Sequence, residues 1–151
     1  MNRILSFFLL AAVMGGFPAT HAQDAIAGTY VSDAYENRFK GFDWVGVVIY
    51  DVTDTTARLQ VRSRNDNPYK RPTCTFDCEL TRHTDGSMTC GLHTKTRLVV
   101  TVEGDMVHLA PSDPTDDVSL MYFCSGGGTM EGSYERIEES LDASQMKKRK
   151  R

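Results

Sequence analysis

Beyond its N-terminal residues, the sequence lacks an apolar run long enough to cross a bilayer, which takes about 20 residues. The one long run, residues 4–14, follows the positive charge of Arg3 and stops before a Gly-Gly-Phe-Pro stretch. Small residues at Thr20 and Ala22 then fit a signal peptidase site, and that site has no cysteine for a lipid anchor. We therefore expect residues 1–22 to be a cleaved signal peptide and the mature protein to be periplasmic or secreted.

Recognisable catalytic motifs are also missing. The sequence has no phosphate loop, dinucleotide fingerprint or metalloprotease motif. Ser125 follows an apolar stretch, as the serine of a nucleophile elbow does, but no glycine stands two positions before it. A hydrolase that uses His93 or His108 as its general base is a minor hypothesis. We predict that the protein is not an enzyme and needs no cofactor.

Positive charge is scarce in the body of the chain. Residues 23–137 hold 11 basic and 17 acidic residues, whereas residues 138–151 hold 5 basic and 3 acidic ones. An acidic body argues against nucleic-acid binding, which needs a basic face, and favours a basic protein partner. The tail lacks an apolar stripe, so we expect a polar, disordered end outside the core. Its alternative role is to bind anionic lipid or nucleic acid.

Residues 97–110 carry the clearest structural pattern. Apolar side chains alternate with polar ones on both sides of Gly104 and Asp105, two residue types that tolerate the positive φ of a tight turn. This pattern predicts a β-hairpin with Leu98, Val100 and Leu109 on its buried face.

Similar patterns predict strands along the rest of the chain, and no segment is convincingly helical. The predicted strands are residues 26–31, 43–52, 58–62, 73–82, 87–94, 118–124 and 129–137, with a loop at residues 33–42. Gly46 suggests a bend or bulge, and in residues 58–62 the charged side chains should point outward. About eight short strands indicate a single all-β domain over residues 23–137, an antiparallel barrel or, alternatively, a β-sandwich.

Four cysteines suit a disulfide-bonded exported domain and allow three pairings. We favour Cys78 with Cys90 across a hairpin, which leaves Cys74 for Cys124. The alternative is a zinc site built from the first three cysteines and His93. An acidic loop with Asp113, Asp116 and Asp117 could in principle hold calcium, but it lacks the twelve-residue ligand pattern.

Two further groups of residues are candidates for binding. The acidic loop and the flexible turn that follows it are candidates for contact with a protein partner; the residues are Asp113, Asp116, Asp117, Ser125, Gly126, Gly127 and Gly128. Four aromatic residues are candidates for lining a ligand cavity inside the barrel, unless they only fill the core: Tyr30, Trp44, Tyr50 and Tyr122. A surface loop at residues 63–72 also holds a basic cluster, namely Arg62, Arg64, Lys70 and Arg71 around Tyr69.

Gly28 and Tyr30 near the start and Arg136 near the end give the chain a resemblance to small exported calycin-like (lipocalin-like) barrels. In that class a Gly-x-aromatic pair and a basic residue meet where the barrel closes. In size, export signal, disulfide use and acidic body, the chain is similar to the periplasmic lysozyme inhibitors of the class. Those inhibitors insert an S-G-x-x-Y loop into the lysozyme cleft, and this chain has only its first two residues, Ser125 and Gly126.

The resemblance and the charge pattern together imply an exported binding or inhibitor protein that blocks a basic cell-wall hydrolase or a toxin. The alternative function is a carrier for a small apolar ligand.

Overall fold

The structure, a computed structural model, describes residues 25–64, 73–116, 118–141 and 143–148. The predicted signal peptide, most of the basic loop with Tyr69, Lys70 and Arg71, and Asp117 lie outside the described residues. Eight strands follow one another along the chain: β1 Gly28–Val31, β2 Trp44–Tyr50, β3 Thr56–Arg64, β4 Thr75–Arg82, β5 Met88–Gly91, β6 Arg97–Glu103, β7 Met106–Pro111 and β8 Gly132–Ile137.

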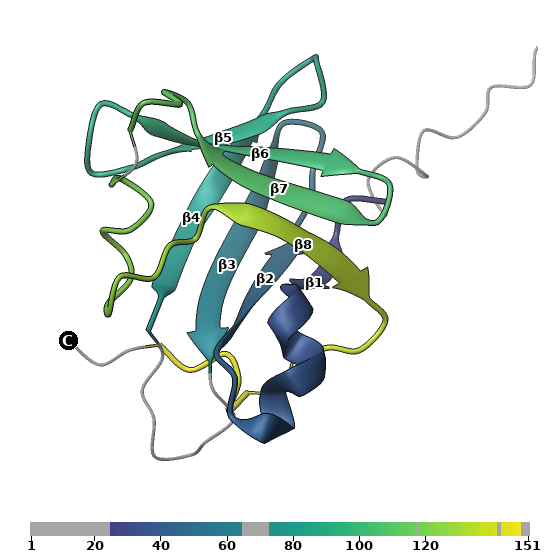
Figure 1. The fold of residues 1–151 in the computed structure, drawn as a ribbon. Coiled ribbons are helices and arrows are strands. Elements are labelled where there is room, and N and C mark those ends of the chain that lie inside the picture. Colours follow the sequence, from purple (N-terminus) through teal and green to yellow (C-terminus); the bar gives the residue numbers. More distant parts are fainter. Residues whose placement is uncertain (1–24, 65–72, 117, 142, 149–151) are drawn as a thin grey trace, which may run out of the picture.

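The eight strands form one closed antiparallel barrel (Figure 1). Each strand pairs with the next one in the sequence, and β8 returns to pair with β1. The predicted barrel is therefore confirmed and the sandwich alternative is wrong. The β6–β7 hairpin turns at Gly104 with φ of 59°, as its sequence predicts.

The barrel interior is filled by the inward side chains of the strands. Leu59, Val61, Leu98, Val100 and Leu109 are almost completely buried there, as the alternation predicts. Burial of a large aliphatic side chain stabilises the fold by about 1.5–3 kcal/mol, so this alternating pattern accounts for much of the driving force for barrel formation.

The first and last strands meet through Gly28, Tyr30 and Arg136. The Arg136 guanidinium stacks on the Tyr30 ring at 4.7 Å and donates to the Ala27 carbonyl at 2.7 Å. A side chain at position 28 would overlap this guanidinium, so the glycine makes the close approach possible. Burial raises the pKa of the Tyr30 phenol, although the cationic Arg136 opposes the shift. The three residues thus lie where the first and last strands pair and close the barrel.

The segment predicted as a loop at residues 33–42 contains a 3-10 helix, η1, Asp33–Lys40. This expectation was wrong because η1 has only one buried side chain, Tyr35, and a single anchor leaves no apolar periodicity to detect. Tyr35 packs edge-on against Trp44 with the ring centroids 4.8 Å apart. Trp44 lies in a second cluster with Val31 and Tyr35, on the opposite face of the sheet from the barrel core.

Two further expectations about the strands were wrong. Gly46 forms no bulge, since the β2 register with β1 and with β3 runs through it without interruption. Its lack of a side chain instead makes room for Leu141, whose Cδ1 would lie 2.6 Å from a Cβ at position 46. Arg62, expected to point into solvent, is 1% exposed although it lies on the outer face of β3.

The C-terminal segment explains why Arg62 is buried. The Arg62 Nε donates to the Met146 carbonyl at 3.1 Å, and its Nη2 pairs with Asp77 at 2.6 Å. Asp77 also pairs with Lys148. Leu141 packs against the second apolar cluster. The described part of the tail therefore lies against the outside of the barrel, although its composition predicts a segment separate from the core.

Candidate binding surface on the β7–β8 loop

The connection between β7 and β8 is the longest loop in the described part of the chain, at about 20 residues. Figure 1 shows it, in green, on the left side of the barrel. The sequence predicts a strand at residues 118–124, but the structure forms consecutive turns there, so this expectation was wrong. The N–H groups of Met121 and Tyr122 both donate to the Val118 carbonyl at 3.1 Å.

Asp116 is the reason that the chain turns at this point. Its Oδ1 accepts the backbone N–H groups of Val118 at 3.3 Å and Ser119 at 2.9 Å, as a helix-capping carboxylate does. Its Oδ2 accepts the Thr96 hydroxyl, and this hydrogen bond is the largest cause of the lowered pKa of Asp116. These local hydrogen bonds override the high β-propensity of the residues that follow.

Asp113 is ionised at the start of the same loop. Its Oδ1 accepts the Thr115 hydroxyl at 2.7 Å and the Thr115 N–H at 3.0 Å. The hydroxyl hydrogen bond is the first cause of the lowered pKa of Asp113. The two predicted acidic contact residues that the structure describes, Asp113 and Asp116, are therefore both anionic at neutral pH.

The far end of the loop is attached to the start of β4. A disulfide joins Cys124 to Cys74, and the Ser125 N–H donates to the Thr73 carbonyl at 2.9 Å. The Thr75 N–H donates to the Phe123 carbonyl at 3.1 Å.

The second disulfide joins Cys78 to Cys90, so the favoured pairing is confirmed. Since all four sulfurs are in disulfides, the thiolates that a zinc site needs do not exist.

An apolar patch faces outward from this fixed loop. Val118, Met121 and Tyr122 are spaced i, i+3 and i+4 and so lie on one face of the turns. Val118 is 69% exposed and Tyr122 is 64% exposed, while Leu120 between them is buried in the core. His93 in the β5–β6 loop packs edge-on against Tyr122 with the ring centroids 5.8 Å apart. We call Val118, Met121, Tyr122 and His93 the loop patch.

The predicted glycine turn lies next to the loop patch in the chain. Gly126 and Gly127 have positive φ values of 69° and 78°, and neither has an atom within 4 Å of the place where a Cβ would lie. Gly128 is different, because a Cβ there would contact the Cys74 Sγ at 3.6 Å. Ser125, Gly126 and Gly127 thus form an open turn, and Gly128 provides close packing at the disulfide.

The four aromatic residues predicted to line a ligand cavity do not come together. Tyr30 is in the barrel core and Trp44 is in the second cluster outside the barrel. Tyr50 accepts a hydrogen bond from Gln60 on the outer face of the sheet at 3.1 Å, and Tyr122 is in the loop patch. This set was wrong because the alternation in β2 places Trp44 and Tyr50 on the outer face of the sheet, while Val47 and Ile49 point into the barrel. No single apolar cavity is lined by these four side chains.

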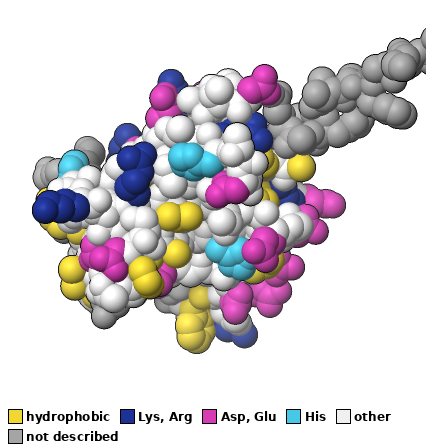
Figure 2. Space-filling view, turned by 90° about the horizontal axis from the view of Figure 1, so that it is seen from above, with side chains coloured by type: hydrophobic (Ala, Val, Ile, Leu, Met, Phe, Trp, Pro, Cys, Tyr) yellow, Lys and Arg dark blue, Asp and Glu magenta, His cyan; other side chains and the backbone are white. Residues whose placement is uncertain are grey.

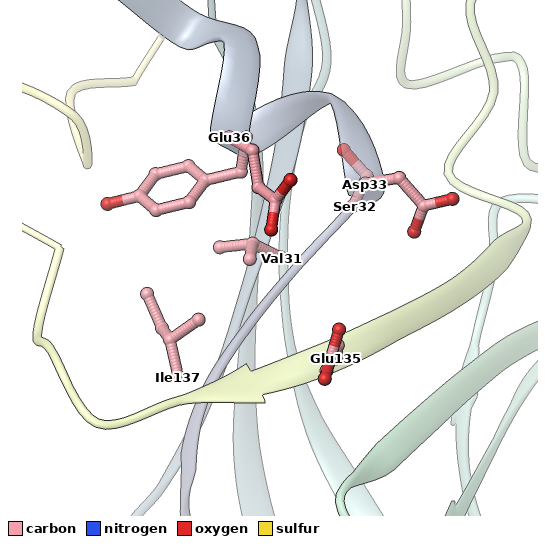
Figure 3. Close-up of a pocket in the computed structure, with 7 residues that line it drawn as sticks. Val31, Ser32, Asp33, Glu36, Glu135 and Ile137 are labelled. Atoms are coloured by element: carbon pink, nitrogen blue, oxygen red, sulfur yellow. The ribbon is translucent and has the colours of Figure 1, made fainter.

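A pocket that the sequence did not indicate lies between η1, β1 and β8 (Figure 3). It has a volume of about 220 Å³, with Val31, Tyr35 and Ile137 as apolar lining. Glu36 and Glu135 place carboxylates beside these residues, as Figure 3 shows. Its lining comes from three separate elements, so no local sequence pattern could reveal it.

His108, a candidate general base, contacts a hydroxyl and a carboxylate. Its Nδ1 is 2.7 Å from the Ser133 hydroxyl and its Nε2 is 4.0 Å from a Glu103 carboxylate oxygen. The register pairs His108 directly with Ser133 on neighbouring strands, which accounts for this contact as a cross-strand pair. Figure 2 shows the molecule from above, with several acidic side chains gathered on the right of the view.

Within the described residues, no group of three or more His, Cys, Asp or Glu side chains is arranged to hold a metal ion. The helical part of the described chain contains no segment with the length and hydropathy of a membrane span. No family model matches the sequence, and neither a curated protein nor a solved structure gives a significant match.

Proposed function

We propose that this chain is a non-enzymatic binding protein that blocks a protein partner through the β7–β8 loop. The observation that supports this most directly is the combination of exposed apolar side chains with a fixed backbone in the loop patch. Exposed apolar patches on stable surfaces are typical of protein interaction sites, and tyrosine is enriched among the residues that contribute most to binding. Because the disulfide and Asp116 already order the loop, binding costs little conformational entropy.

The charge around the loop patch suggests the chemistry of the partner. Asp113 and Asp116 stay ionised, and the body of the chain is acidic. Such a surface speeds the association of a basic protein, and the effect weakens as salt is added. A basic peptidoglycan hydrolase such as a lysozyme fits this description. Export to the periplasm or beyond is part of the proposal, supported by the two disulfides and the N-terminal signal pattern.

The first experiment measures the residual activity of a panel of lysozymes and other peptidoglycan hydrolases with the oxidised protein in excess. We expect stoichiometric inhibition of at least one enzyme, with an association rate that falls at high salt. The double variant V118S/Y122A should weaken inhibition of that enzyme by more than tenfold, since it removes two apolar side chains that binding would bury.

The matched control is F39A/F42A, which truncates two exposed phenylalanines at and just after the end of η1, away from the loop. It should inhibit as the parent does. If no enzyme of the panel is inhibited, the hydrolase-blocking function is wrong. If V118S/Y122A inhibits as well as the parent does, the loop patch is not the contact surface.

A further inference from the structure

The end of η1 presents a second apolar surface that the proposed function does not use. Phe39 is 79% exposed and Phe42 is 57% exposed, the first being the most exposed large hydrophobic side chain in the described residues. Figure 1 shows η1, in dark blue, at the bottom of the barrel, away from the β7–β8 loop on the left. We call residues 38–42 the η1 tip. Neither phenylalanine belongs to the two apolar clusters of the fold, so both rings are available for contact with a partner.

Hydrogen bonds and a ring contact attach the start and middle of η1 to β2, and a left-handed residue closes its end. At its start, the Ser32 N–H donates to the Val45 carbonyl at 2.9 Å and the Val45 N–H donates to the Ser32 Oγ at 3.0 Å. At its end, Gly41 takes a left-handed conformation with φ of 88°, and its N–H donates to the Arg38 carbonyl at 3.1 Å. In the middle of η1, the Tyr35 ring packs against Trp44 of β2. The phenylalanines therefore lie at the end of a helix whose start and middle are attached to the barrel.

Two cationic residues, Arg38 and Lys40, flank Phe39 in the sequence. Arg38 stacks its guanidinium over the Phe39 ring at 4.3 Å and over the Tyr35 ring at 3.9 Å. Lys40 follows, with its Nζ 3.0 Å from the Asn37 side-chain oxygen. The acidic residues of η1 are at its other end, in the first turn, and Asp43 is the one acid directly after the tip. Cations and aromatic rings thus gather at one end of η1 in an otherwise acidic protein.

We infer that the η1 tip docks on an anionic lipid bilayer. Phenylalanine side chains insert at the boundary between head groups and acyl chains, and each nearby lysine or arginine gains about 1 kcal/mol from an anionic surface. Phe39 projects from the protein instead of lining a groove, and a bilayer can receive a projecting ring without a matching pocket. Insertion of the two rings alone, or attraction of the two cations alone, would bind the protein to the bilayer only weakly, so the proposed docking needs both interactions.

The test is vesicle sedimentation of the protein that starts at Gln23, which removes the apolar N-terminal run and keeps every described residue. The probes are vesicles of phosphatidylcholine alone and vesicles in which part of the lipid is phosphatidylglycerol. The parent should partition onto the mixed vesicles at least about fivefold more strongly than onto the neutral ones. F39S/F42S should lose at least about tenfold in partitioning. K40Q should lose about fivefold on mixed vesicles only.

Two variants make the result specific. F39W/F42W should keep the partitioning of the parent, because tryptophan suits the membrane interface, and its emission should shift to the blue on mixed vesicles. V118S/Y122A, altered in the loop patch, should partition as the parent does, which separates this inference from the proposed function. Parent protein that ignores both vesicle types would overturn the inference, and so would F39S/F42S that partitions as the parent does. Loss of hydrolase inhibition in F39S/F42S would identify the η1 tip as a protein contact instead.

Discussion

Replacing Asp77 by asparagine should be one of the more damaging single changes on the outside of the barrel. The Arg62 side chain is 1% exposed, and its Nη1 already donates to the Val61 carbonyl at 2.8 Å and the Phe76 carbonyl at 3.0 Å. Asp77 supplies its neutralising charge. Removing one partner of a fully buried pair costs about 3–5 kcal/mol, and because Asp77 is 28% exposed we expect about 2–3 kcal/mol for D77N.

Urea denaturation at pH 7 measures this loss, with Asp51→Asn as the matched control. Asp51 pairs with Arg58 at 3.7 Å, but both side chains are more than half exposed, so D51N should cost at most about 1 kcal/mol. D77N also releases Lys148, and trypsin should therefore cut the C-terminal segment faster than in the parent. Equal stability losses for D77N and D51N would refute the view that the buried Arg62 depends on its partner.

Three other changes test separate parts of the barrel. Gly28→Ala should destabilise the fold by about 1–3 kcal/mol, because its methyl group overlaps the Arg136 guanidinium; thermal melting measures the loss, and an unchanged melting temperature would contradict the close approach. Burial raises the pKa of the Tyr134 phenol above its usual value of 10. The unfolded chain then releases this proton first, so stability should fall as pH rises above about 10, and Y134F should flatten this fall in urea titrations at alkaline pH. The double variant C74A/C124A, which lacks one disulfide, should lower the free energy of unfolding by about 4 kcal/mol because the bridge closes a loop of 50 residues. A loss below about 1 kcal/mol in urea denaturation would contradict the chain-entropy account.

The elements that could be predicted from the sequence are those in which local and global preferences agree. In the β6–β7 hairpin the alternation, the turn residues and the burial all favour one register, so Leu98 and Val100 face inward as predicted. The disulfide pairing was predictable for a related reason. Cys78 and Cys90 flank a hairpin turn, which brings them together and leaves Cys74 for Cys124.

The elements that could not be predicted depend on contacts between distant segments. Residues 118–124 have the composition of a strand, but Asp116 and the disulfide at Cys124 fold them into turns. Arg62 has the place of a solvent-exposed residue in an alternating strand and is buried only because residues 141–148 cover it. Within the candidate site, the acidic residues and the open glycine turn were identified from sequence. The exposed Val118 and Tyr122 were not, since their exposure follows from the turns.

The placement of the two proposed surfaces follows from how the barrel uses its apolar residues. Side chains of the strands fill the interior, so binding functions fall to the loops and to the outer face. The η1 tip and the loop patch are on separate sides of the barrel, as Figure 1 shows, so a protein docked on a bilayer through Phe39 and Phe42 keeps Tyr122 accessible. If the protein inhibits a hydrolase as proposed, we therefore expect equal inhibition in solution and on phosphatidylglycerol-containing vesicles. Inhibition that disappears on vesicles would mean that the two surfaces compete, and at least one of them would then be assigned to the wrong side of the barrel.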